Sequence, residues 1–172
     1  CDFEHFSKSL SIHIDRVPQD IKKIRKPIVG FIGSVSEYKI NFELIYEIAN
    51  NLKNISFVFI GPIDENINII KIKKLKKLKN IYFFGYREYK DLPYYCSHID
   101  IGWLPLVHNK YTKSMFPLKF FEYLASGLPV VSTKLDSLKE FQQYIKMIGN
   151  FIMTMFYQFY KVYIKIIMRL FL

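Results

Sequence analysis

Cysteine is scarce in this sequence of 172 residues, which contains only Cys1 and Cys96. These two residues form neither a metal-binding pattern nor a disulfide framework, so a reducing compartment is the default expectation. The histidines also lack the spacing of metal ligands; they are His5, His13, His98 and His108. We therefore expect no bound metal and no cofactor.

Arginine is the second scarce residue. The net charge is +10, yet lysine carries nearly all of the positive charge, and the only arginines are Arg16, Arg25, Arg87 and Arg169. Recognition of phosphates and guanine bases favours the arginine fork. The densest lysine cluster, at residues 71–79, lies opposite an Ile/Leu stripe and predicts a solvated helix face. We interpret the basic charge as a solvated surface and expect no nucleic-acid partner.

Signals for export and for several common nucleotide sites are also missing. The opening residues, CDFEHFSKSL, have neither the basic start nor the apolar run of a signal peptide. Because they begin with cysteine and not methionine, we expect a piece of a longer chain. No Walker loop, nucleophile elbow or GxGxxG motif occurs. This excludes kinase and nicotinamide-dehydrogenase functions, and we expect a cytoplasmic protein.

What the sequence does contain is a regular alternation of strand and helix patterns. Short apolar runs, which predict buried strands, occur at residues 28–32, 55–60, 81–84, 99–104 and 128–131. Helical patterns occur between them, at residues 41–52, 69–78 and 89–97. This alternation is typical of a parallel sheet covered by helices on both faces. We predict a doubly wound, Rossmann-like α/β domain over residues 27–140, preceded by a lead-in segment at residues 1–26.

Glycine ends three of the predicted strands, at Gly33, Gly61 and Gly85. Sheets of this class bind ligands beyond the carboxyl ends of their strands. The three glycines therefore predict a phosphate or nucleotide crevice at that edge.

Residues 114–133, SMFPLKFFEYLASGLPVVST, combine a helix pattern with unusual charges. Ser114 can N-cap a helix whose first turn contains Pro117 and which ends at Gly127. Lys119 and Glu122 lie three residues apart on one face. A lysine in the first turn opposes the helix dipole unless an external anion such as a phosphate lies there. The residues alone still favour an ordinary ion pair on a solvated face, because such pairs are common.

Residues 141–172 have a different composition. From residue 150 onward the sequence is apolar with one narrow polar stripe, and its longest uncharged run is too short for a membrane span of ~20 residues. We predict a helical tail and leave three interpretations open: a helix that packs on another domain, an interfacial amphipathic helix, or an altered gene end. The second leaves room for a rival function, a non-catalytic module that docks on a partner or on the inner face of the plasma membrane.

The order of the elements, together with several motifs, resembles the C-terminal, nucleotide-sugar-binding half of GT-B glycosyltransferases. The likeness is strongest to the glycosyl transferases group 1 family and covers roughly residues 1–140. CDFEHF resembles the segment that enters the C-terminal domain, and KPIVGFIGSV resembles its first strand and glycine turn. ISFVFIGP and NIYFFGYREYKDLPYYCSHIDIGWLPL resemble the next three strands, and PLKFFEYLASGLPVVST resembles the donor-site helix.

The resemblance implies a role for each candidate residue. Glu122 would accept hydrogen bonds from the ribose hydroxyls, and Lys119 would lie near the diphosphate. The turn at Gly33 and Ser34 would let the diphosphate approach the backbone. The remaining donor-site residues would be Tyr86 and Arg87 beside the base, and Ser114, Met115, Phe116 and Pro117 beneath the donor sugar and phosphates.

The resemblance also implies the chemistry. A nucleoside diphosphate leaves, and fixed cations and helix N-terminal amides stabilise its charge without a metal. Two departures stand out: Ser34 occupies the place of an arginine, with Lys39 as a stand-in, and Ser114 occupies the place of a second glutamate. The acceptor would bind to an N-terminal domain that this chain lacks. We therefore expect a hexosyltransferase fragment, of surface polysaccharide synthesis, that binds donor weakly and transfers no sugar alone.

Overall fold

A parallel sheet of six strands forms the centre of the protein, in the order β3-β2-β1-β4-β5-β6. The computed structural model describes residues 1–148, with side chains as far as residue 141. The strands are β1 (Ile28–Ile32), β2 (Ser56–Ile60), β3 (Ile81–Gly85), β4 (Ile101–Leu104), β5 (Val130–Thr133) and β6 (Ile145–Ile148). The five predicted strands are confirmed with small shifts of their ends.

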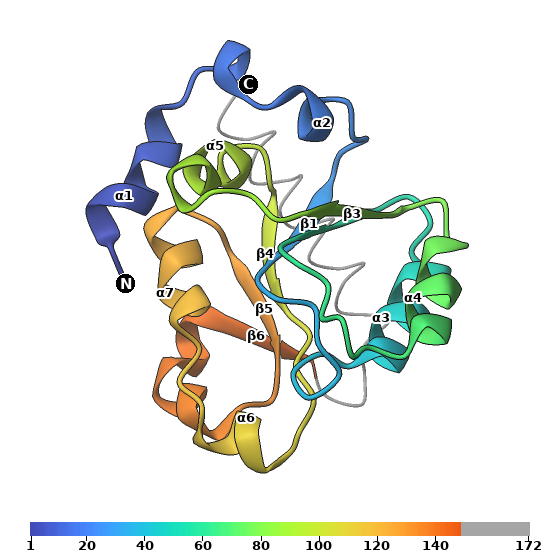
Figure 1. Ribbon diagram of the computed structural model, residues 1–172. Helices are drawn as coiled ribbons and strands as arrows, with labels where there is room; N and C mark the ends of the chain where they lie inside the picture. Colours follow the sequence, from blue (N-terminus) through green and yellow to red (C-terminus); the bar gives the residue numbers. More distant parts are fainter. Residues whose placement is uncertain (149–172) are drawn as a thin grey trace.

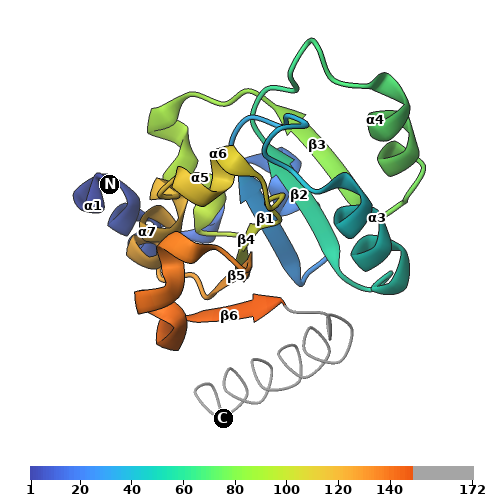
Figure 2. The ribbon, with the colours of Figure 1, turned by 90° about the horizontal axis from the view of Figure 1, so that it is seen from below.

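The helices cover both faces of this sheet (Figure 1, Figure 2). The α-helices are α1 (Phe3–Ser7), α2 (Gln19–Lys22), α3 (Phe42–Asn51), α4 (Ile69–Lys76), α5 (Leu92–Cys96), α6 (Lys110–Ser114) and α7 (Leu118–Ala125). Short 3-10 helices are η1 (Lys8–Ser11), η2 (Ile14–Arg16), η3 (Tyr89–Asp91) and η4 (Asp136–Tyr144). No helix within residues 1–148 has the length and apolarity needed to cross a membrane.

Two hydrophobic cores follow from the alternation of side chains along the strands. Along β1, Val29 and Phe31 join the core beneath α3 and α4, whereas Ile28 and Ile32 join the core beneath α1, α5 and α7. Every residue of β1, β2 and β4 is buried. A sheet buried on both faces is a doubly wound α/β fold, so the predicted fold class is confirmed.

The lead-in segment packs onto this domain. Phe6 and Ile21 have no exposed surface, and Val17 has almost none. Helix α1 packs against α5 and α7, where Cys96 is also buried. Burial raises the pKa of the Cys96 thiol to about 11, so this cysteine is a core residue and not a nucleophile.

The prediction of a helical tail from residue 141 is wrong at residues 145–148. Residues Ile145–Ile148 form β6, which pairs in parallel with β5. The free edge of β5 offers unpaired backbone groups, and a following segment in extended conformation satisfies them. Residues 149–172, where the rest of the predicted tail lies, are outside the described residues.

Candidate functional site

A cavity of about 370 Å³ opens at the carboxyl ends of β1 and β4. These strands are neighbours at the centre of the sheet, where the strand order reverses direction. Such a switch point is the usual ligand site of a doubly wound sheet. Six of the predicted site residues line the cavity: Gly33, Ser34, Met115, Phe116, Pro117 and Lys119.

The floor of the cavity begins at a close approach of two glycine turns. The Gly33 N–H donates to the Ile60 carbonyl at 2.8 Å. A Cβ atom on Gly61 would lie 2.1 Å from the Gly33 carbonyl oxygen, and the φ of Gly61 is +146°. Only glycine fits at this position. The turn after β1 is therefore held against the turn after β2, and the backbone at Gly33 borders the cavity.

The segment before α7 differs from its prediction. Ser114 does not cap α7; it ends α6, and its hydroxyl donates to the Lys110 carbonyl. Pro117 is the N-cap residue, in place of a first-turn proline. The residues that lead up to Ser114 form the short helix α6, which begins at a capping box formed by Asn109 and Thr112. Ser114 is exposed and does not line the cavity.

Lys119 and Glu122 form an ion pair with each other. The Lys119 side chain keeps 29% of its surface exposed and the Glu122 side chain only 10%. Lys119 also lines the cavity, whereas Glu122 is not among the lining residues. The i,i+3 ion pair that the residues alone favoured is present, although the pair is partly buried and not on a solvated face.

Helix α7 is fixed to the sheet by Tyr123, which the sequence reasoning did not single out. The buried Tyr123 hydroxyl accepts a hydrogen bond from the Ile32 N–H at 2.8 Å. Its ring lies so close to Gly102 that a Cβ atom there would be 2.5 Å from the ring. Contacts with β1 and β4 therefore fix the position of the helix that carries Lys119 and Glu122 relative to the sheet.

Lys39 is the second cation of the cavity. Its ammonium group lies 5.2 Å from the centre of the Tyr38 ring and 5.8 Å from that of Tyr111. The side chain is half-buried, and within residues 1–141 no carboxylate forms an ion pair with it. A desolvated lysine without a counter-ion favours an anionic ligand.

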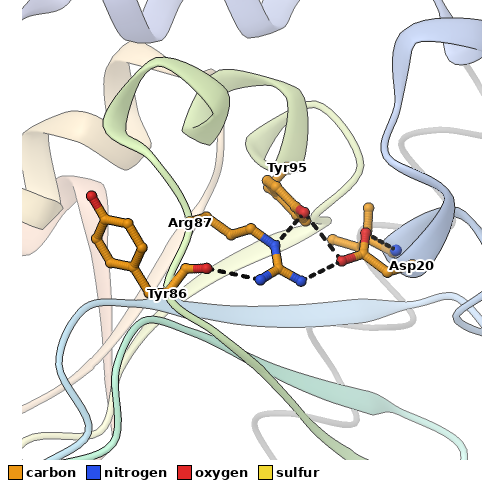
Figure 3. A network of polar contacts seen from close by, with 5 residues as sticks. Asp20, Tyr86, Arg87 and Tyr95 are labelled. Carbon is orange, nitrogen blue, oxygen red and sulfur yellow. Dashed lines mark hydrogen bonds and ion pairs between the residues drawn. The ribbon is translucent and has the colours of Figure 1, made fainter.

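Tyr86 and Arg87 lie in the loop after β3, outside the lining of the cavity. The Tyr86 side chain is exposed. The guanidinium of Arg87 bonds to Asp20 of α2 and to Tyr95 of α5, as Figure 3 shows. Arg87 is therefore held by protein groups in the absence of ligand, and its partner Asp20 is a residue that sequence reasoning missed.

The neighbouring η3 connects this loop to Glu122. Burial raises the pKa of the Tyr89 phenol, and the nearby charge of Glu122 raises it further. The His5 ring stacks on the Tyr89 ring with 4.4 Å between their centres. The Tyr89 ring also contacts the Phe6 ring, 5.7 Å between centres, and the Lys119 ammonium lies 5.6 Å from the centre of that same Phe6 ring. Within residues 1–148, no group of three or more metal-ligating side chains occurs.

The fold is a doubly wound domain with a cavity at its switch point, lined by Lys39 and Lys119. The sequence pattern of the family "Glycosyl transferases group 1" matches residues 26–147. The chain therefore belongs to that family. The described fold is that of the C-terminal half of a GT-B glycosyltransferase.

Individual relatives agree with this assignment. The chain is 36% identical over 116 residues to the Bacillus subtilis (strain 168) protein TuaH, which is named as a glycosyltransferase of teichuronic acid biosynthesis. The match covers 67% of this chain but only 29% of TuaH. The C-terminal domain of the group 1 protein LpcC from Francisella tularensis superposes with a TM-score of 0.66 at 22% identity, covering 86% of this chain and 80% of that one.

A ligand-bound structure is also similar. Anabaena Alr3699/HepE, solved in complex with UDP and glucose, superposes with a TM-score of 0.61 at 17% identity. The superposition covers 86% of this chain and 41% of HepE. The chain thus spans less than half of the length of these two larger relatives.

Proposed function

We propose that this chain is the donor-binding half of a glycosyltransferase. The whole enzyme would move a sugar from a nucleoside diphosphate to a saccharide or lipid-linked acceptor in the synthesis of a cell-surface polysaccharide. Membership of the family supports the reaction class, and the name of TuaH supports the polysaccharide. The acceptor site would lie on a second domain, upstream of this one.

The observation that carries the proposal is the cationic cavity at the switch point. Lys39, in the turn before α3, and Lys119, in the first turn of α7, both line this cavity, and the backbone turn at Gly33 borders it. The first residues of α7, Leu118 and Lys119, line the same space, and the N-terminus of this helix has no side-chain cap within residues 1–141. This combination of two ammonium groups and backbone donors suits a diphosphate, which carries the charge that develops when the sugar leaves.

Glu122 would bind the ribose in this arrangement. Its carboxylate is buried and bonded to Lys119 when no donor is present. A ribose brings two hydroxyl donors that can replace the ammonium as partners of the carboxylate. Lys119 would then turn to the diphosphate. Because the proposed roles need only this chain's groups, no metal is part of the proposal.

Calorimetric titration of the full chain with UDP, GDP and ADP tests the proposal. We expect at least one to bind, and Glu122→Gln to weaken it by about tenfold or more, the value of a hydrogen bond to a charged group. Lys39→Ala should weaken the diphosphates more than the matching monophosphates. Lys73→Ala, on the exposed face of α4, is the matched control. Absence of binding by all three nucleotides, or equal affinities for Glu122→Gln and Lys73→Ala, would refute the donor site.

A further inference from the structure

The loop after β3 is tied to the lead-in segment by a single guanidinium group. Arg87 donates from NH2 to the Asp20 carboxylate at 2.8 Å and from Nε to the Tyr95 hydroxyl at 2.6 Å. Its third bond, from NH1, reaches the backbone carbonyl of Tyr86 at 2.8 Å. The Tyr95 hydroxyl in turn donates to Asp20 at 3.1 Å. One side chain therefore joins α2, α5 and the loop (Figure 3).

Both carboxylate oxygens of Asp20 accept hydrogen bonds in this network. The other oxygen of Asp20 accepts from the Ile21 N–H at 2.8 Å. Burial alone would raise the pKa of the Asp20 carboxyl, but the hydrogen bonds from Arg87, Ile21 and Tyr95 outweigh it and hold the pKa below its usual value. The carboxylate is thus charged at neutral pH, and each of the three guanidinium nitrogens of Arg87 already donates one hydrogen bond to a protein group.

The stability that this network supplies is small, because the ion pair is partly exposed. The side chains of Arg87 and Asp20 keep 30% and 35% of their surface. Ion pairs at such exposure contribute about 0–1 kcal/mol. The network does determine how the loop after β3 is oriented, because a planar guanidinium group bonded to three fixed acceptors allows only one orientation of the loop.

Tyr86 is the residue whose position depends on this. Arg87 donates a hydrogen bond to the Tyr86 carbonyl, while the Tyr86 ring points away from Arg87 (Figure 3). Tyr86 is 68% exposed. The loop continues into η3, whose Tyr89 ring contacts Phe6 with 5.7 Å between centres, and the Lys119 ammonium that pairs with Glu122 lies 5.6 Å from the centre of the same Phe6 ring. A flat aromatic ring held there can stack on a base whose ribose lies at Glu122.

We propose that Asp20 is a positioning residue for the nucleotide base, acting through Arg87 on Tyr86. The inference rests on the proposed donor site and deepens it. Asp20 does not touch the nucleotide; it fixes the guanidinium that fixes the Tyr86 backbone. Because α2 precedes β1, the lead-in segment then takes part in base selection, and a shift of that segment changes the base site.

A double-mutant cycle on the full chain tests this, with UDP, GDP and ADP affinities measured by calorimetry. Tyr86→Ala should weaken the preferred nucleotide by about tenfold, the lower end of the value of one stacked base. Asp20→Asn should weaken it severalfold in the wild-type background and less than twofold in the Tyr86→Ala background. Glu88→Gln is the matched control, because it removes a carboxylate of the same loop that pairs only with Lys90.

Each outcome decides between the alternatives. Equal losses from Asp20→Asn in both backgrounds would mean a general structural effect and would overturn the inference, as would a loss no larger than that of Glu88→Gln. If Asp20→Asn does not fold, Arg87→Lys replaces it in the cycle, since lysine keeps the charge but cannot reach three acceptors. A wild-type chain that binds none of the nucleotides would overturn the donor site itself, whereas nucleotide binding without coupling overturns only the role of Asp20.

Discussion

Removing one oxygen atom from Tyr123 should loosen the helix that carries Lys119 and Glu122. In Tyr123→Phe, the ring still fills its place beside Gly102, so no cavity forms. The Ile32 N–H, however, loses its acceptor. Ile32 is 3% exposed, so water cannot easily replace the phenol.

The size of the effect follows from this unpaired donor. A buried N–H without a partner costs about 1–3 kcal/mol. For a chain of this length, 1 kcal/mol lowers the melting temperature by about 2–4 °C, so we expect a decrease of about 2–12 °C in thermal unfolding followed by circular dichroism. Nucleotide affinity should fall as well, because α7 is held to β1 by this bond.

Tyr94→Phe is the control for this experiment. Its hydroxyl accepts from the Arg16 guanidinium at 2.8 Å, but at an exposed site where water can take over. We expect its melting temperature to stay within about 1–2 °C of the wild type, as for other surface changes. Equal melting temperatures for the two variants would refute the argument that Tyr123 anchors α7.

Three further predictions concern the glycine turns, the ion pair and acid stability. Gly61→Ala should unfold the chain or lower its stability by on the order of 3 kcal/mol, because the new Cβ atom would collide with the backbone of Gly33. Gly85→Ala should cost only about 1 kcal/mol, because its Cβ atom meets nothing within 4 Å and only the positive φ is unfavourable. Chemical denaturation measures both changes. Lys119→Ala should cost about 3 kcal/mol by leaving the Glu122 carboxylate buried without a cation, and adding Glu122→Gln should recover most of that stability but no nucleotide binding. Because the pKa of Asp20 is lower in the folded than in the unfolded chain, its contribution is present at neutral pH and lost as the pH falls below about 4. Melting temperatures measured between pH 5 and pH 2.5 should therefore fall less steeply for Asp20→Asn, and an unchanged slope would contradict this.

The sheet could be predicted because its strands are buried on both faces. Runs such as Ile28–Ile32 have no polar face, which limits them to a parallel sheet between helix layers. The position of the cavity followed from the same pattern, since Gly33 marks the carboxyl end of β1 and lines the cavity. Local sequence carries both signals, so no long-range contact had to be known.

The errors arose where tertiary contacts or competing local signals decide. Ser114 has the residue type of an N-cap, but Asn109 and Thr112 form a capping box five residues earlier and start a separate helix there. The spacing of Asn109 and Thr112 was visible in the sequence and could have predicted α6. The Asp20–Arg87 contact joins residues 67 positions apart, and no local pattern indicates it. Strand β6 likewise depends on the free edge of β5, not on its own composition.

The Lys119–Glu122 pair shows why the ordinary and the functional interpretation of two charges need not exclude each other. An exposed i,i+3 pair would be worth only about 0.2–0.5 kcal/mol and would need no explanation. Here the carboxylate keeps 10% of its surface, so it needs a compensating group whether or not a ligand is present. Lys119 supplies that group and still reaches the cavity. In the proposed function, the donor's hydroxyls would replace Lys119 as partners of Glu122, and its phosphates would replace Glu122 as the partner of Lys119. The Glu122 carboxylate is already desolvated in the folded chain, so donor binding would not have to supply that cost. The desolvation cost of Glu122 is therefore met by a residue that also lines the cavity, so an ordinary ion pair and the proposed donor site can use the same two charges.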